Sequence, residues 1–234
     1  MAKKEEQTTH TSIDDLNEQL TGLEVKVQNN TKKIMWGIVA VLAVVCLILI
    51  WVYAVRRPGI QAADNAIGQA DMSLALGNDS LALRQYTAVA DDYGYDAGNR
   101  AALNAAIILY NNKQYEAAID YLKKYSPTET LIGASSQSLM GDCYVNLKQY
   151  DEAVKCFREA AEISDNNPHY TPYFLMKEAT VQRELKNYKA EADLYRQIEE
   201  KYPAFAAETG IETAKYLQRA ELSAQQATEG VSAE

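Results

Sequence analysis

Residues that commonly carry catalysis are few in this sequence and lie far apart along it. The two histidines are His10 and His169, and two of the three cysteines, Cys143 and Cys156, lie in the second half of the chain. Nucleophilic, acid–base and metal sites need such groups to converge with a carboxylate or a base. His10 is predicted in a disordered tail and His169 in a loop, and the glycine patterns that hold phosphates or dinucleotides are missing. We therefore expect no catalytic residue, no metal site, no cofactor and no enzymatic activity.

Cys143 and Cys156 fall on the two helices of one predicted helical hairpin. Free cysteines are often buried and behave as small apolar residues. We interpret both as packing residues, and a disulfide between them is the alternative that the sequence leaves open.

The composition favours a helical, acidic binding domain. Of 234 residues, 47% are hydrophobic and 24% charged, with 5 prolines and 11 glycines, which is typical of a globular helical chain. The formal net charge is −9; residues 1–57 carry 7 basic and 6 acidic side chains, so −10 falls on the remainder. An acidic domain is not drawn to phosphates or to anionic lipid, so we expect no nucleic-acid partner.

An uncharged apolar run near the N-terminus predicts a transmembrane helix. Residues 34–55 read IMWGIVAVLAVVCLILIWVYAV. A helix of this length measures about 33 Å at about 1.5 Å per residue, enough to cross a hydrocarbon core of roughly 30 Å. Trp36 and Trp51 lie near its two ends, and Lys33 and Arg56 flank it, as is typical of membrane interfaces.

Other interpretations of this run are a buried core helix, a cleaved signal and a lipoprotein signal. A core helix normally keeps a polar stripe, which this run lacks. A secretory signal has a shorter apolar region, of about 7–15 residues, and a small-residue cleavage site. A lipoprotein signal needs a small residue before the acylated cysteine, whereas Val45 precedes Cys46. An uncleaved signal anchor therefore agrees best with the sequence.

Residues 1–33 are predicted to form a cytoplasmic tail with a short amphipathic helix, the first 11 residues being disordered. The apolar residues of the helix recur at spacings of 3 and 4: Ile13, Leu16, Leu20, Leu23 and Val27. A short coiled coil and a helix on the membrane surface both match this pattern. Three lysines precede the span and two arginines follow it. The positive-inside rule barely distinguishes the two possible membrane orientations from these counts. A short tail and a long C-terminal domain favour a cytoplasmic N-terminus.

The rest of the chain repeats one pattern. A small residue is followed nine positions later by an aromatic residue, then by another small residue and by a bulky one. The copies are Gly141, Tyr150, Ala153 and Phe157; Ala106, Tyr115, Ala118 and Leu122; Ala179, Tyr188, Glu191 and Tyr195; and a fainter one at Ala70, Asp79, Ala82 and Tyr86. The first small residues are 36, 35 and 38 positions apart along the chain.

Each column of this pattern has a physical role in a helical hairpin. A small residue lets the second helix approach the first, and an aromatic residue at the start of the second helix packs back across the turn. Residues i and i+4 share a face of a helix, so the second small residue and the bulky one point the same way. The pattern resembles the tetratricopeptide repeat, which implies an all-α solenoid.

This resemblance divides the chain into an anchor and one repeat domain. The repeat domain covers 56–222, with repeats near 63–97, 98–132, 133–170 and 171–204, a capping helix over 205–222, and a disordered tail over 223–234. Two residues depart from the pattern: Glu191 replaces the second small residue, which allows a shifted frame, and Asp79 replaces an aromatic. The stretch DNNPHYTP, which accounts for the longest spacing, is predicted to be a loop.

In tetratricopeptide repeats the first helices line a concave groove, so the resemblance implies a partner-binding site there. The implied groove residues are Arg100, Leu103, Ile107, Tyr110, Ser138, Asp142, Val145, Tyr173, Thr180 and Arg183. The lysine, asparagine and arginine clamp by which some members hold peptide C-termini is not recognisable. Leu103, Ile107 and Tyr110 indicate an apolar patch instead, suited to a helix or an extended segment of another protein.

The order of features resembles bacterial single-span membrane proteins related to the ancillary subunit of the SecYEG translocon. The stretches GNDSLAL, DAGNRAALNAAI and NPHYTPYFLMKEATVQREL are similar to members from the Bacteroidetes. This resemblance implies an inner-membrane protein with a periplasmic repeat domain, a non-catalytic, chaperone-like adaptor for translocon components or secreted chains. The alternative function is a structural element of an envelope complex that forms homo-oligomers through the heptad helix and the span.

Overall fold

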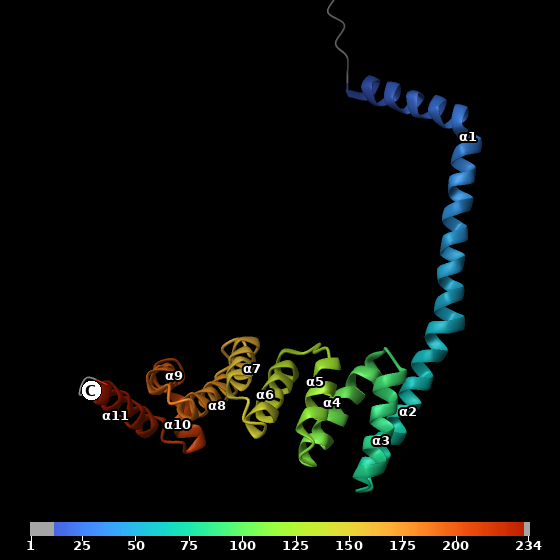
Figure 1. Ribbon diagram of the computed structural model, residues 1–234. Coiled ribbons are helices and arrows are strands. Elements are labelled where there is room, and N and C mark those ends of the chain that lie inside the picture. The colour runs from blue at the N-terminus through green and yellow to red at the C-terminus, as the bar shows by residue number, and fades with distance from the viewer. Residues whose placement is uncertain (1–11, 232–234) are drawn as a thin grey trace, which may run out of the picture. The chain divides into compact units, whose positions relative to one another are not determined.

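The computed structural model describes residues 12–231, and every regular element in that range is a helix (Figure 1). The all-α prediction is therefore confirmed. The chain divides into two compact units between Gly59 and Ile60. His10 and the predicted disorder of residues 1–11 lie outside the described residues.

The N-terminal unit is dominated by one long helix, α1 (Ser12–Trp51). The predicted amphipathic helix and apolar span are thus one continuous helix. A π-helical turn, η1 (Val52–Arg56), follows, with the backbone N–H of Arg57 donating to the Val52 carbonyl. Pro58 has no backbone N–H and so cannot make the ordinary α-helical bond, which accounts for the irregular turn just before it.

The helical stretch from Thr31 to Ala75 is long and apolar enough to cross a membrane. None of its most apolar window is buried inside the protein. Large apolar side chains such as Leu42, Leu47 and Ile50 are exposed around it. A buried core helix, one of the alternative interpretations of the sequence, does not agree with this exposure.

The second unit is built from helix pairs that follow one another in chain order (Figure 1). The pairs are α2 (Arg57–Ala75) with α3 (Asp79–Asp92), α4 (Asp96–Asn111) with α5 (Tyr115–Lys124), α6 (Thr130–Asn146) with α7 (Tyr150–Ile163), and α8 (Thr171–Glu184) with α9 (Tyr188–Lys201). Successive pairs touch through α3 and α4, α5 and α6, and α7 and α8, as expected of a solenoid.

The repeated small residues occupy the tightest positions of this unit. Ala70, Ala106 and Ala179 are fully buried. Gly141 is buried too, and a Cβ placed on it would lie 2.7 Å from the Phe157 ring of the partner helix. The small residues therefore allow the two helices of each pair to pack closely, as the sequence pattern predicted.

The turns inside the pairs share a left-handed residue that the sequence pattern did not reveal. Lys113, Lys148 and Lys186 have φ values of 60°, 58° and 60°, and Gly77 has 74° in the equivalent turn. After α4, the N–H of Lys113 donates to the Tyr110 carbonyl. These bonds satisfy carbonyls at the helix end, and the next helix begins two residues later.

Asp79 replaces an aromatic residue of the pattern without loss of the helix. It is the first residue of α3, and the side chain of Asn78 caps that helix by accepting a hydrogen bond from the Leu81 N–H (3.2 Å). Side-chain capping here satisfies a free donor at the helix start.

The C-terminal region differs from the sequence prediction in two ways. The capping helix expected over 205–222 is two helices, α10 (Ala204–Thr209) and α11 (Thr213–Val231), separated at Gly210, whose φ is 71°. The predicted disorder from residue 223 is wrong as far as Val231, because α11 continues to that residue. The segment is polar, but alanine, glutamine and glutamate are good helix formers.

Candidate protein-binding groove

An apolar pocket of about 700 Å³ opens between the first helices of three consecutive pairs, α4, α6 and α8. Its lining includes Leu103, Ile107, Leu131, Ile132, Ser135, Ser138, Leu139, Asp142, Tyr170, Tyr173, Phe174 and Lys177. Ile107, Leu131, Ile132 and Tyr173 are 39–41% exposed, which leaves a concentration of large apolar side chains in contact with water. Concave apolar surfaces of this kind typically bind ligands or partner chains.

Five of the ten residues predicted for the groove line this apolar pocket. They are Leu103, Ile107, Ser138, Asp142 and Tyr173. They come from three different helices, spaced by the repeat length, so the solenoid brings together positions that lie far apart along the chain.

The other five predicted residues do not line the apolar pocket. Arg100 lines a neighbouring pocket, and Arg183 lies 3.6 Å from the buried Glu191. Tyr110 packs edge-to-face on Tyr115, with ring centroids 5.7 Å apart.

The remaining two serve local packing and bonding. Val145 packs against a buried cluster that contains Ala153, and the Thr180 hydroxyl donates to the Met176 carbonyl (2.9 Å).

Lys177 is a pocket residue that the sequence pattern did not reveal. Its Nζ donates to Asp142 Oδ2 (2.6 Å) and to Ser138 Oγ (3.0 Å), and it lies 5.4 Å from the centre of the Phe157 ring. The ion pair joins α6 to α8 across the pocket. Lys177 lies four residues after Tyr173, and residues i and i+4 share one face of a helix. This spacing could have placed Lys177 in the groove.

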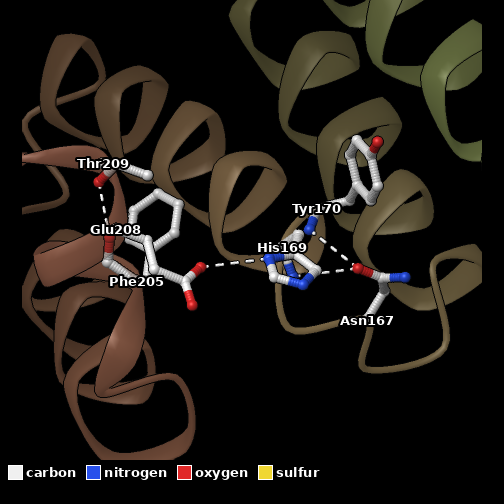
Figure 2. A network of polar contacts seen from close by, with 6 residues as sticks. All are labelled: Asn167, His169, Tyr170, Phe205, Glu208 and Thr209. Carbon is white, nitrogen blue, oxygen red and sulfur yellow. Dashed lines mark hydrogen bonds and ion pairs between the residues drawn. The ribbon is translucent and has the colours of Figure 1, made fainter.

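The loop before α8 is held in place by polar contacts on both sides. Figure 2 shows Asn167 Oδ1 accepting hydrogen bonds from the backbone N–H groups of His169 (3.0 Å) and Tyr170 (3.2 Å). His169 Nδ1 lies 3.2 Å from Glu208 Oε2 of α10. These contacts order the loop that brings Tyr170 to the pocket, so His169 has a bridging position rather than one in a cluster of reactive groups.

Helix α10 supports the same end of the pocket through aromatic packing. The Tyr173 ring meets the buried Phe205 ring edge-to-face, with centroids 4.8 Å apart and an interplanar angle of 86°. The capping region therefore does more than close the solenoid, because it also fixes a wall of the apolar pocket.

A second pocket, of about 670 Å³, adjoins the apolar one and shares Leu103 and Ile132 with it. We call it the Asp96–Glu129 pocket; its other lining residues are Asn99, Arg100, Asn104, Tyr125 and Thr128. Asn99 fixes its rim, since its amide donates to the Ser126 carbonyl and accepts from the Ser126 N–H, both at 2.7 Å. The two pockets together form one groove across α4, α6 and α8.

Cys143 and Cys156 are both buried and free, so no disulfide joins them in the structure. Burial raises the pKa of Cys143 to about 12 and that of Cys156 to about 11, because a buried thiolate loses its hydration. Within residues 31–229, no cluster of three or more histidine, cysteine or carboxylate side chains is arranged to hold a metal ion.

We expect both thiols to resist alkylation in the folded protein. At pH 8 each is far below its pKa, so the reactive thiolate is scarce. Peptide mass spectrometry after iodoacetamide treatment should find Cys143 and Cys156 unmodified before unfolding and modified after unfolding in urea. Equal labelling in both states would contradict this environment, and thiols released only by reduction would reveal a disulfide.

The stacked helix pairs and the groove on their first helices define a class, the α-solenoid scaffolds that bind other proteins. Family models described as Tetratricopeptide repeat match residues 67–128 and 134–167, so the chain contains tetratricopeptide repeats. Proteins with such repeats are typically non-catalytic scaffolds for protein–protein interaction. No curated protein sequence matches the chain.

Solved structures show the same fold at low sequence identity. A crystal structure of MamA protein superposes with a TM-score of 0.51 at 15% identity, over 71% of this chain and 94% of that one. A crystal structure of a Podosopora anserina putative kinesin light chain with nearly identical TPR-like repeats gives 0.52 at 15% identity, over 71% and 88%. These likenesses establish the solenoid and nothing finer.

Proposed function

We propose that this protein is a membrane-anchored, non-catalytic adaptor that binds a partner protein in the groove across α4, α6 and α8. The observation that carries the proposal is the group of large apolar side chains, Ile107, Leu131, Ile132 and Tyr173, which stay about two-fifths exposed in a pocket. Exposed apolar surface costs free energy in water, which a partner recovers by covering it.

The anchor part of the proposal is supported by the apolar helix and its flanks. Isoleucine, leucine and valine each contribute roughly −0.3 to −0.6 kcal/mol to insertion of a helix, so residues 34–55 favour the bilayer. The repeat domain carries −10, which argues against electrostatic attraction to anionic lipid as the means of attachment.

We further propose a site of action at the bacterial inner membrane, with the repeat domain in the periplasm and a chaperone-like role beside the secretion machinery. The resemblance to proteins related to the ancillary translocon subunit supports this placement. Fusion of a reporter enzyme to the C-terminus tests it, since a periplasm-dependent reporter is active only if the domain crosses the membrane. An active cytoplasmic reporter would contradict it.

Replacing Ile107 by serine is expected to lower the yield of partner crosslinked to the full-length protein in membranes by several-fold. Ile107 is 41% exposed, so the substitution should lower the free energy of unfolding by only about 1 kcal/mol and leave the domain folded. The matched control is Leu222→Ser, which removes an exposed leucine of α11 outside both pockets. Equal loss in the two variants, or loss in neither, would contradict a role for the groove.

A second candidate is a structural element that forms oligomers through α1. The continuity of α1 favours it, because the helix that carries the heptad spacing leads directly into the apolar run. Deleting residues 1–30 and measuring the mass in detergent tests this function. An unchanged number of protomers per complex would contradict it.

A further inference from the structure

We infer that the groove is selective for an extended polypeptide segment that carries a large apolar side chain a few residues away from a lysine or arginine. This inference rests on the proposed function and specifies the chemistry of the partner. It combines the apolar lining of one pocket with the two unpaired carboxylates of the pocket beside it.

The two pockets form a continuous surface with two kinds of lining. Leu103 and Ile132 belong to both, so a chain lying across them contacts the apolar pocket on one side and the Asp96–Glu129 pocket on the other. The apolar pocket, of about 700 Å³, is roomy enough for a leucine or aromatic side chain together with its backbone. Burial of such a side chain removes apolar surface from water and so favours binding.

The Asp96–Glu129 pocket leaves two carboxylates free. Neither Asp96 nor Glu129 has an ion-pair partner among the described side chains, whereas Arg100, in the same pocket, already pairs with Asp71 (3.4 Å). A basic side chain is therefore the group that this pocket attracts.

An acidic segment has to compete with existing ion pairs, since both cations that line the groove, Arg100 and Lys177, already pair with aspartates. Lys177 is the cation of the apolar pocket, and its ammonium group is already bound by Asp142 and Ser138. A ligand carboxylate would have to break this pair and would lie in the field of Asp96 and Glu129. Charge selection therefore acts against acidic sequences as well as in favour of basic ones.

An extended conformation suits the groove because its backbone remains free to form hydrogen bonds. The hydroxyls of Thr128 and Ser135 lie at the two pockets and have no partner among the described residues. The backbone N–H and C=O groups of a bound chain need such partners when water is excluded.

The test uses four fluorescent peptides of equal length and the full-length protein in a neutral detergent. Three peptides carry leucine with lysine, glutamine or glutamate at the neighbouring position, and the fourth carries serine with lysine. By fluorescence anisotropy we expect affinity to fall in the order lysine, glutamine, glutamate, with about fivefold between the extremes, as for an exposed ion pair. Raising the salt concentration should narrow this range, and the serine peptide should bind weakly.

A pair of charge variants locates the preference. In Asp96→Asn/Glu129→Gln the lysine and glutamate peptides should bind equally, while the glutamine peptide keeps its affinity. The matched control, Glu116→Gln/Asp120→Asn, removes two exposed carboxylates of α5 outside the groove and should keep the preference. Glu129→Gln by itself should halve the logarithm of the ratio between the affinities for the lysine and glutamate peptides. This single variant keeps the test decisive if the double variant folds poorly.

The outcomes separate this inference from the proposed function. Binding of all three leucine peptides with equal affinity, or a preference for glutamate, overturns the inference and leaves the adaptor function standing. A lysine preference that survives in Asp96→Asn/Glu129→Gln also overturns it, since the charge then acts elsewhere. Failure of every leucine peptide to bind contradicts the groove as a partner site and so the proposed function itself.

Discussion

Replacing Gly98 by alanine is expected to lower the free energy of unfolding by about 3 kcal/mol or more, because overpacking against a rigid wall has no easy relief. Gly98 lies in the first turn of α4, and a Cβ on it would lie 1.8 Å from the Tyr93 carbonyl oxygen and 2.8 Å from the Tyr93 carbonyl carbon. Both atoms belong to the backbone, so relief requires moving the connection between α3 and α4. Urea unfolding of the full-length protein in detergent measures the loss.

The matched control is Gly68→Ala. Gly68 lies within α2 and is exposed, and a Cβ placed on it would meet no other atom within 4 Å. Alanine is a better helix former than glycine by roughly 1 kcal/mol, so this change should raise the stability. Opposite signs for the two substitutions would confirm the close approach at Gly98, and similar small effects would contradict it.

Replacing Arg219 by methionine is expected to lower the free energy of unfolding by about 2 kcal/mol, less than the roughly 3–5 kcal/mol typical of a broken buried ion pair. Glu191 is fully buried, and its Oε1 accepts a hydrogen bond from Arg219 Nη2 of α11 (2.6 Å). The expected loss is smaller because the Arg219 side chain is 40% exposed, so water weakens the pair. In addition, Arg183 Nη1 lies 3.6 Å from Glu191 Oε1 and still compensates part of its charge. Methionine keeps much of the arginine stem but leaves the buried carboxylate poorly compensated.

The same two helices supply the control for this ion pair. Arg196 of α9 pairs with Glu221 of α11 at 2.7 Å, with both side chains over two-fifths exposed. Arg196→Met should therefore cost less than about 1 kcal/mol, as surface ion pairs do. The variant Glu191→Ala/Arg219→Met should be more stable than Arg219→Met, because it removes the buried charge. Equal losses for Arg196→Met and Arg219→Met would contradict the importance of burial.

Loss of the Glu191–Arg219 pair also has a functional consequence. It loosens α11 from α9, and α10, which precedes α11, packs on the pocket through Phe205 and Tyr173. We therefore expect Arg219→Met to become more sensitive to proteolysis near Gly210, between the two helices. The capping region thereby links the stability of the solenoid end to the order of the apolar pocket.

Several features of this fold could be predicted because they depend on local patterns. The repeat of small, aromatic and small residues, such as Ala106, Tyr115 and Ala118, reflects contacts within one helical hairpin. The apolar run at 34–55 is detectable because a membrane-spanning helix needs consecutive apolar residues, whatever surrounds it. The end of α11 escapes prediction because the segment from residue 223 is polar, as disordered segments are, although its residues favour a helix.

The sequence by itself therefore determined the class of this protein, an apolar helix followed by tetratricopeptide-like repeats, since hydrophobic periodicity and helix-pair packing act over short stretches of chain. Only the tertiary structure decided that Ile107 and Tyr173 share a pocket with Lys177. It also decided that Glu191 itself occupies the buried position of the last repeat, paired with Arg219, so the repeat frame is not shifted there. These contacts join different helix pairs. Their geometry depends on how each pair rotates against the next, and that rotation follows from the packing of whole helices rather than from any local spacing.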